Sequence, residues 1–143
     1  MTDLKMNVAE LEKFLQVEFP QAFSRGDVAI ESADGGSCLL RQRYNEQMLR
    51  PGGTVSGPTL MALADYAMYV VLLSAIGPVG LAVTTNFNIN FLRKGLPGQD
   101  VLAAAKLLKL GKRLAVGEVV LLSGTSPDPI AHVTATYSIP NAR

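Results

Sequence analysis

One stretch of this chain constrains its fold more than any other feature. Residues 56–73 predict a helix that is apolar nearly all round, and Asp65 is the only charged residue between positions 57 and 92. Such a helix is buried, in a protein core or in a membrane. A carboxylate there must be paired, hydrogen-bonded or neutralised. Two interpretations of Asp65 therefore stay open: a structural acid that bonds a neighbouring loop or subunit edge, and a catalytic acid or base.

The length of this stretch also raises the question of a membrane span, because residues 60–83 are long and apolar enough to cross a bilayer. A lipid-facing Asp65 would be costly, and the Gly-Pro-Val-Gly sequence at 77–80 breaks the helix after roughly four to five turns. A β-type pattern follows, rather than a cluster of Lys and Arg. We therefore expect a core helix and no membrane partner.

Length and composition exclude several classes of protein. The 143 residues fit one domain spanning 1–143, with residues 1–25 as an N-terminal helical extension. A net charge of +1 gives no footprint for nucleic acid. The N-terminus lacks a secretory signal pattern, so a cytoplasmic protein is expected. Only 17% of residues are charged against 48% hydrophobic, which hints at further surface buried in an oligomer.

The chain is poor in metal ligands and in reactive side chains outside the helix. Cys38 is the sole cysteine, so no internal disulfide can form, and we expect an inert core thiol. One Cys and one His cannot complete a usual zinc site without carboxylates, and no metal is expected. His132 is the only histidine and lies in a predicted strand. We expect it to lie on the surface or to have a hydrogen-bond partner, rather than to be catalytic.

The remaining elements predict an antiparallel sheet around the helix. Residues 7–19 form an amphipathic helix with Asn7 and Glu10 as a capping box, and Pro20 ends it. Strands are expected at 27–32 and 37–44, joined by an Asp-Gly turn, and at 82–92, 100–110, 114–123 and 130–139. Residues 101–109 are rich in Ala and Leu, but turns spaced like hairpins favour a strand there. The fold class is α+β.

Two patterns within this plan bear on a site. In the long strand, the alternation places Thr85, Phe87, Ile89 and Phe91 on one apolar face. Before the buried helix, Ser56 is a natural N-cap, and the free N–H groups near Gly57 can hold an oxyanion or a polarised carbonyl. The alternative is that this Gly-rich and Pro-rich segment is only a tight loop before a helix.

In order and spacing, these segments resemble the hotdog-fold acyl-CoA thioesterases, in particular the PaaI-like branch. The resemblance spans roughly residues 28–139. Its carriers are Gly-Thr-Val-Ser-Gly-Pro-Thr-Leu-Met-Ala-Leu-Ala-Asp at 53–65, Asn-Ile-Asn-Phe-Leu-Arg at 88–93, Gly98, Gly-Lys-Arg at 111–113 and Ala-Thr-Tyr at 135–137. It implies a hotdog fold, in which a curved antiparallel sheet wraps one long central helix, here with a short N-terminal helix added.

The resemblance also implies an activity and an assembly. Members dimerise by joining two sheets edge to edge, often into tetramers, with the active site between subunits. By analogy, the N–H of Gly57 polarises a thioester carbonyl, and Asp65 of the partner acts as general base or nucleophile. Thr84 lies near the position where some members place a Ser or Thr that orients water. No cofactor is implied, because CoA is part of the substrate.

The substrate-binding residues that the resemblance implies include departures from the family pattern. Lys94, Lys112 and Arg113 stand at loop ends where CoA phosphates could be neutralised. Ser56 replaces the usual His, and Arg50 stands where members often have an Asn. Pro58 removes a backbone donor. These changes keep open a second class, a hotdog protein that binds acyl-CoA or another acyl ligand without hydrolysing it. A hydratase is weaker, since it needs an Asp–His pair and His132 is the only histidine.

Overall fold

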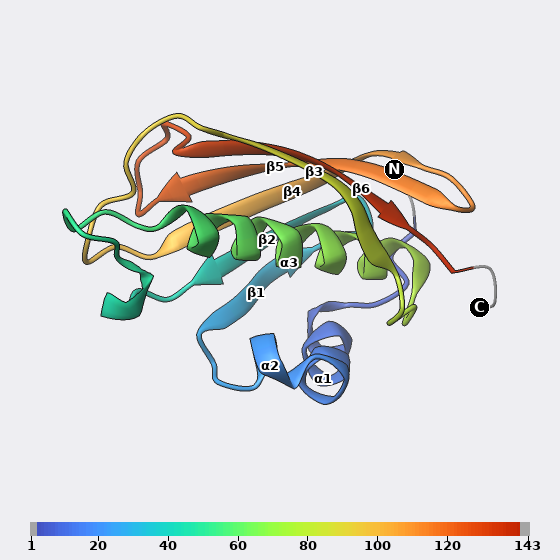
Figure 1. Cartoon of the computed structure of the whole chain (residues 1–143). Coiled ribbons are helices and arrows are strands. Elements are labelled where there is room, and N and C mark those ends of the chain that lie inside the picture. The colour runs from blue at the N-terminus through green and yellow to red at the C-terminus, as the bar shows by residue number, and fades with distance from the viewer. Residues whose placement is uncertain (1–2, 141–143) are drawn as a thin grey trace.

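The computed structural model describes residues 3–140 and shows one long helix wrapped by a curved antiparallel sheet (Figure 1). The order along the chain is α1 (Val8–Glu18), α2 (Pro20–Phe23), β1 (Val28–Ala33), β2 (Ser37–Gln42), the short 3₁₀ helix η1 (Glu46–Met48), α3 (Gly57–Ile76), β3 (Val83–Phe91), β4 (Val101–Leu110), β5 (Leu114–Ser123) and β6 (Ala131–Ser138). The α+β prediction is confirmed, and 101–110 is a strand.

Helix α3 begins and ends as its sequence predicts. The Ser56 hydroxyl accepts a hydrogen bond from the backbone N–H of Thr59, and Gly77 ends the helix with a positive φ of 96°. The helix is long and apolar enough to cross a membrane, with a mean hydropathy of 1.8, yet 67% of that window is buried inside the protein. It is the core helix of this fold, because its apolar surface packs on the sheet.

The sheet has six strands in the order β1-β2-β4-β5-β6-β3, with every neighbouring pair antiparallel. Side chains alternate between a buried face toward α3 and a more exposed outer face. Strand β1 at one edge contacts α1 and α2. Strand β3 at the other edge is much more exposed, with Val83 56% and Phe91 54% accessible.

A glycine lets the helix approach the sheet closely at the middle of β5. A Cβ on Gly117 would lie 2.5 Å from the sulfur of Met68 and 2.9 Å from the carbonyl oxygen of Lys106. The thioether of Met68 fills the space that a side chain at 117 would take, since Met68 is fully buried. Gly117 is therefore required by packing rather than by backbone conformation.

The N-terminal helices differ in one respect from the prediction. The capping box of Asn7 and Glu10 is present, and α1 ends before Pro20 as expected. Pro20 also begins the second helix α2, which the sequence reading missed, because proline suits the first turn of a helix. Phe19 and Phe23 from this junction pack edge-on or tilted against Tyr66 of α3.

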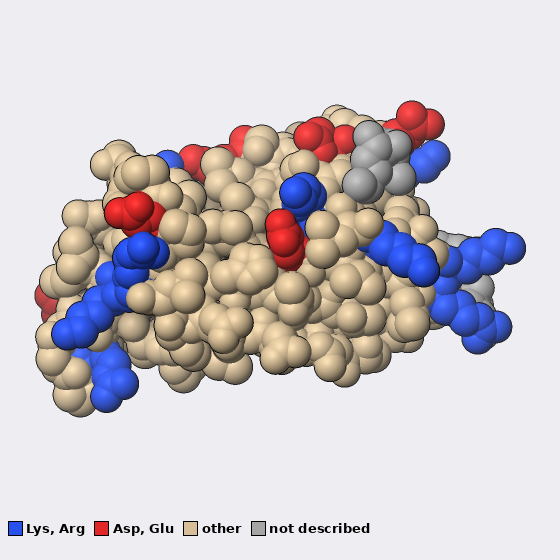
Figure 2. All heavy atoms as spheres, turned by 90° about the horizontal axis from the view of Figure 1, so that it is seen from above, with Lys and Arg blue, Asp and Glu red and all other residues tan. Residues whose placement is uncertain are grey.

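The outer face of the sheet is largely uncharged, with one ion-paired cluster near its middle (Figure 2). There Glu118 lies 3.7 Å from Nζ of Lys106 and 3.4 Å from Nε2 of His132. His132 thus has a partner on the outer face and lies on the opposite side of the sheet from α3. The predicted satisfied surface histidine is confirmed.

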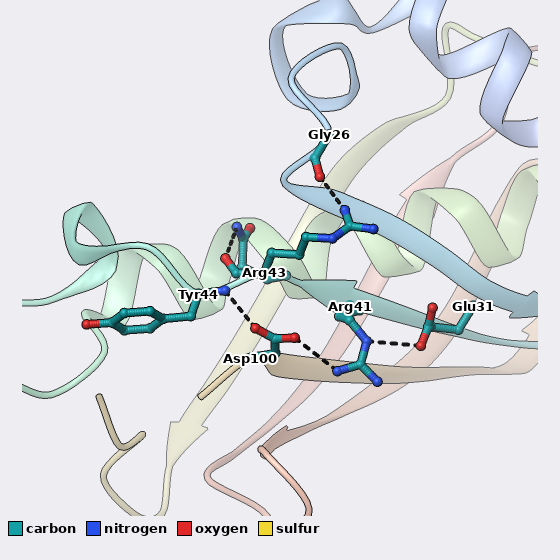
Figure 3. A network of polar contacts seen from close by, with 7 residues as sticks. Gly26, Glu31, Arg41, Arg43, Tyr44 and Asp100 are labelled. Carbon is teal, nitrogen blue, oxygen red and sulfur yellow. Dashed lines mark hydrogen bonds and ion pairs between the residues drawn. The ribbon is translucent and has the colours of Figure 1, made fainter. Parts of the chain in front are cut away.

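A second polar network fixes the end of the sheet where β1, β2 and β4 meet (Figure 3). Arg41 joins Glu31 at 3.0 Å and Asp100 at 3.1 Å, and Asp100 accepts the backbone N–H of Tyr44 at 2.8 Å. Arg43 donates to the carbonyl of Gly26. These contacts hold the strand ends and the loop after β2 in register.

Candidate functional site

Asp65 is partly buried, on the face of α3 that turns toward β3 and β6. Its carboxylate oxygen Oδ1 accepts 2.6 Å and 2.9 Å hydrogen bonds from the hydroxyls of Thr84 and Tyr137. Tyr137 also donates to the main-chain oxygen of Asp65 at 3.1 Å. Within residues 3–140 no donor bonds the second oxygen, Oδ2. One oxygen is held by the fold, and the other is available to a ligand or a water molecule.

A β-bulge decides which threonine reaches the carboxylate. Thr84 pairs with Tyr137 across β3 and β6, whereas Asn86 pairs with Thr136, so Thr85 is the extra residue of the bulge. The prediction that Thr85, Phe87, Ile89 and Phe91 share one face is therefore wrong for Thr85. Thr84 shares the inner face, and Thr85 bonds the carbonyl of Thr136 instead.

Tyr137 is a site residue that the sequence reading did not single out. Its side chain is 4% exposed and stacks on Tyr69, with ring centroids 6.1 Å apart. Burial, and then the negative charge of Asp65, raise the pKa of the Tyr137 phenol, which therefore stays protonated and acts as a donor. The available signal was a phenol at an inward position of a strand otherwise filled by Ala and Val.

Two cavities meet at Asp65 and Thr84. One, of about 460 Å³, is walled by aromatic and small residues and has the Glu18 carboxylate on its lining. The other cavity, of about 370 Å³, runs between α3 and β3. In addition to Asp65 and Thr84, it is lined by Met61, Ala62 and Phe87. The carboxylate thus lies where an apolar group and a reacting centre can be placed side by side.

Gly57 is the first residue of α3, and its N–H has no acceptor among the described residues. A Cβ at this position would lie 3.2 Å from the ring of Phe91, the last residue of β3. The predicted donor is present, because the first N–H groups of a helix have no partner inside it. Ser56 uses its hydroxyl as the N-cap and also contacts the Thr59 hydroxyl at 2.8 Å.

A basic cavity opens beside this helix start. It measures about 530 Å³, and its lining includes Gly57, Phe91, Arg50, Arg93 and Lys94. Arg50 and Lys94 are two of the residues expected near a ligand, and Arg93, which ends the Asn-Ile-Asn-Phe-Leu-Arg segment, is a third cation on the same lining. Ser56 is not among the lining residues.

Two other expected residues lie elsewhere. Lys112 and Arg113 form the turn between β4 and β5, whereas Lys94 precedes β4. The ten residues of β4 separate these positions by roughly 30 Å. Figure 2 accordingly shows basic side chains at both ends of the molecule. Within one protomer Lys112 and Arg113 therefore lie far from Gly57, at the end of the sheet where β3 begins, since Leu114 pairs with Ser138 and Ser138 with Val83.

Gly57 and Asp65 are also separated within one protomer. Eight residues of α3 place them about 12 Å apart along the helix axis. A single carbonyl group cannot contact both, since each contact requires about 3 Å. One protomer therefore holds two half-sites: a carboxylate beside Thr84 at the start of β3, and a free N–H beside Phe91 at its end.

No group of three or more His, Cys, Asp or Glu side chains suited to a metal ion occurs in the described part of the chain.

Comparisons with known proteins agree with the fold. The family model described as thioesterase superfamily matches residues 52–129. The acyl-coenzyme A thioesterase 13 of Homo sapiens is 27% identical over 117 residues, which are 81% of this chain and 82% of that protein.

Solved structures extend the likeness over nearly the whole chain. A candidate thioesterase of Silicibacter sp. TM1040 is 43% identical with a TM-score of 0.89, and the match covers 97% of this chain and 95% of that one. The PaaI protein from the phenylacetic acid degradation operon of E. coli has a TM-score of 0.75 at 23% identity, covering 91% and 95%. At that identity it shows the fold alone. The expected hotdog fold is confirmed.

Proposed function

The chain belongs to the thioesterase superfamily, and from this we propose that it is an acyl-CoA thioesterase of the PaaI-like branch, which hydrolyses acyl-CoA thioesters. Asp65 is the general base or the nucleophile, and the N–H of Gly57 polarises the thioester carbonyl. The observation that carries the proposal is the carboxylate itself: Oδ1 is held by Thr84 and Tyr137, Oδ2 has no donor from residues 3–140, and Asp65 lines two cavities.

The chemistry suits these two groups. As a general base, the Asp65 carboxylate takes a proton from water while the water oxygen attacks the carbonyl carbon. The negative charge that develops on the carbonyl oxygen is stabilised by an N–H at the positive end of a helix. The C–S bond then breaks, and the CoA thiolate takes the proton from the Asp65 carboxyl and leaves as a thiol. As a nucleophile, the carboxylate forms an acyl anhydride first, which water hydrolyses.

A second copy of the chain is needed to unite the two half-sites. Strand β3 is the exposed edge of the sheet, with Thr84 near its start and Phe91 at its end. If two β3 strands pair antiparallel about Asn88, Phe91 of each protomer lies opposite the bulge formed by Thr84 and Thr85 of the other. Gly57 packs on Phe91 and Asp65 bonds Thr84. We therefore propose a homodimer, which two-fold symmetry can extend to a tetramer, with two intersubunit sites.

The basic cavity supplies a binding site for the CoA end of the substrate. Arg50, Arg93 and Lys94 line the same cavity as Gly57, so phosphate groups bound there leave the thioester near the helix start. Ser56 contributes by capping the helix that holds Gly57. Lys112 and Arg113 lie at the end of the sheet where β3 begins, so in the proposed dimer they lie at the same end as Gly57 of the partner. They are therefore further candidates for binding the CoA phosphates. The reaction requires no cofactor.

The test is hydrolysis of a panel of acyl-CoAs, from short aliphatic to aromatic, followed by thiol release. Asp65→Asn is compared with the wild type and with Asp128→Asn, which makes the same chemical change in an exposed loop. We expect Asp65→Asn to lower kcat/KM by about 10²–10⁴-fold with the oligomer intact, and Asp128→Asn to match the wild type.

Two other outcomes would reject the proposal. No turnover of any thioester by the wild type, together with acyl-CoA binding by calorimetry, would leave a non-catalytic binding protein. Equal activity of Asp65→Asn and the wild type would mean that the carboxylate is structural.

A further inference from the structure

We propose that Tyr137 is a positioning residue for Asp65: it fixes one carboxylate oxygen, so that Oδ2 alone reacts. The inference rests on the proposed function for its kinetic consequence, and on geometry for the contact itself.

The phenol reaches Asp65 from a different element than Thr84 does. Tyr137 comes from β6 and Thr84 from β3, and the two residues are directly paired in the sheet. Their hydroxyls converge on one atom, Oδ1, at 2.9 Å and 2.6 Å. Two donors from adjacent strands restrict rotation of the carboxylate, which neither could do as well alone.

Tyr137 is itself held in place on several sides. Its ring is 4% exposed and stacks nearly parallel on Tyr69, with an interplanar angle of 19°. The Tyr69 hydroxyl donates at 2.9 Å to the carbonyl of Gly80, in the segment that leads into β3. The position of the phenol is thus fixed by its strand, by this stack and by its two bonds to Asp65.

The environment of Asp65 contains few other charged or titratable groups. From α1, Glu18 lines the larger cavity, and from α3, Tyr69 lines the same cavity. Strands β3 and β6 present only the hydroxyls of Thr84 and Tyr137 to the carboxylate. With no cation among these groups, the two hydroxyls are the donors that hold the carboxylate of Asp65 in place.

The decisive variant is Tyr137→Phe, which keeps the ring and removes only the hydroxyl. Tyr69→Phe is the matched control, because it removes the neighbouring phenol hydroxyl, which bonds Gly80 and not Asp65. We expect kcat of Tyr137→Phe to fall by about three- to tenfold, with KM nearly unchanged, since the carboxylate loses one of the two donors that orient it. Tyr69→Phe keeps both donors to Oδ1, so its kcat should exceed that of Tyr137→Phe.

A measurement that needs no substrate separates this inference from the proposed function. Crystal structures of the wild type, Tyr137→Phe and Tyr69→Phe give the orientation of the Asp65 carboxylate. A carboxylate that changes orientation or loses order only in Tyr137→Phe supports the positioning role, even if the wild type hydrolyses no tested thioester. A carboxylate that keeps its orientation in Tyr137→Phe would overturn it, whatever the activity.

Discussion

The hydroxyl of Thr84 lies 2.6 Å from Oδ1 of Asp65, and this bond joins the edge strand β3 to the middle of helix α3. It exists because a bulge at Thr85 turns Thr84 toward the helix. The edge strand that is proposed to form the dimer is thereby also the strand that orients the proposed base.

Thr84→Val should lower kcat by about tenfold, because valine keeps the shape and removes a hydrogen bond to a charged group. Thr84→Ser should retain most of the activity. The control is Thr85→Val, because the Thr85 hydroxyl donates to the Thr136 carbonyl and not to the carboxylate. Steady-state thiol release measures all three, and an equal loss in Thr84→Ser and Thr84→Val would contradict a role for the hydroxyl.

Gly57→Ala should reduce activity without reducing stability. The added methyl would lie 3.2 Å from the Phe91 ring, which is half-exposed and can shift. The backbone of Gly57 does not have a positive φ, so alanine fits it and restricts the unfolded chain. We expect an unchanged or higher Tm and a kcat/KM lower by about tenfold, as the approach to the N–H narrows.

The double variant Gly57→Ala with Phe91→Ala tests the cause of that loss. If crowding by the Phe91 ring causes the loss in Gly57→Ala, the loss of kcat/KM in the double variant should be smaller than the product of the losses in the two single variants. Simple addition of the two losses would show that they act independently.

Gly117→Ala should destabilise the protein by about 1–3 kcal/mol, because a Cβ would overlap the Met68 sulfur and crowd the Lys106 carbonyl. Urea unfolding followed by circular dichroism measures the loss. Shortening the methionine in Gly117→Ala with Met68→Ala should show a favourable coupling energy relative to the two single variants. A neutral Gly117→Ala would mean that helix and sheet can separate at no cost.

Cys38 should resist thiol reagents at pH 8 in the native protein and react fully in denaturant. Burial raises the pKa of this thiol to about 12, from an ordinary value of 9.0, and its S–H donates to the Ala67 carbonyl at 3.3 Å. Because the pKa of Cys38 is higher in the folded than in the unfolded chain, the unfolded chain loses this proton first. The free energy of unfolding is therefore unaffected by Cys38 below pH 9 and declines as pH rises from 9 toward 12. The slope is at most about 1.4 kcal/mol per pH unit.

Cys38→Ala provides the comparison for the alkaline range. Its free energy of unfolding should fall less between pH 9 and 10.5 than that of the wild type. Parallel decline in the two proteins would show that other groups cause the loss.

Local patterns in the sequence were sufficient for the elements and for one site residue. The apolar helix, its cap at Ser56, its end at Gly77 and the alternating strands depend on contacts within a few residues, which the sequence displays directly. Asp65 was recognisable because a lone acid in an apolar helix always needs a partner.

Tertiary structure decided what surrounds that acid. Tyr137 is 72 residues from Asp65, and only the pairing of β3 with β6 brings the two together. The bulge that selects Thr84 over Thr85 is a matter of register, and strict alternation cannot reveal it. The separation of Gly57 from Asp65, and of Lys94 from Lys112, follows from the direction of α3 and β4. The sequence by itself thus determined the elements and the isolated carboxylate, because these depend on local chemistry. The partners of that carboxylate depend on how distant segments pack, and only the folded chain decided them.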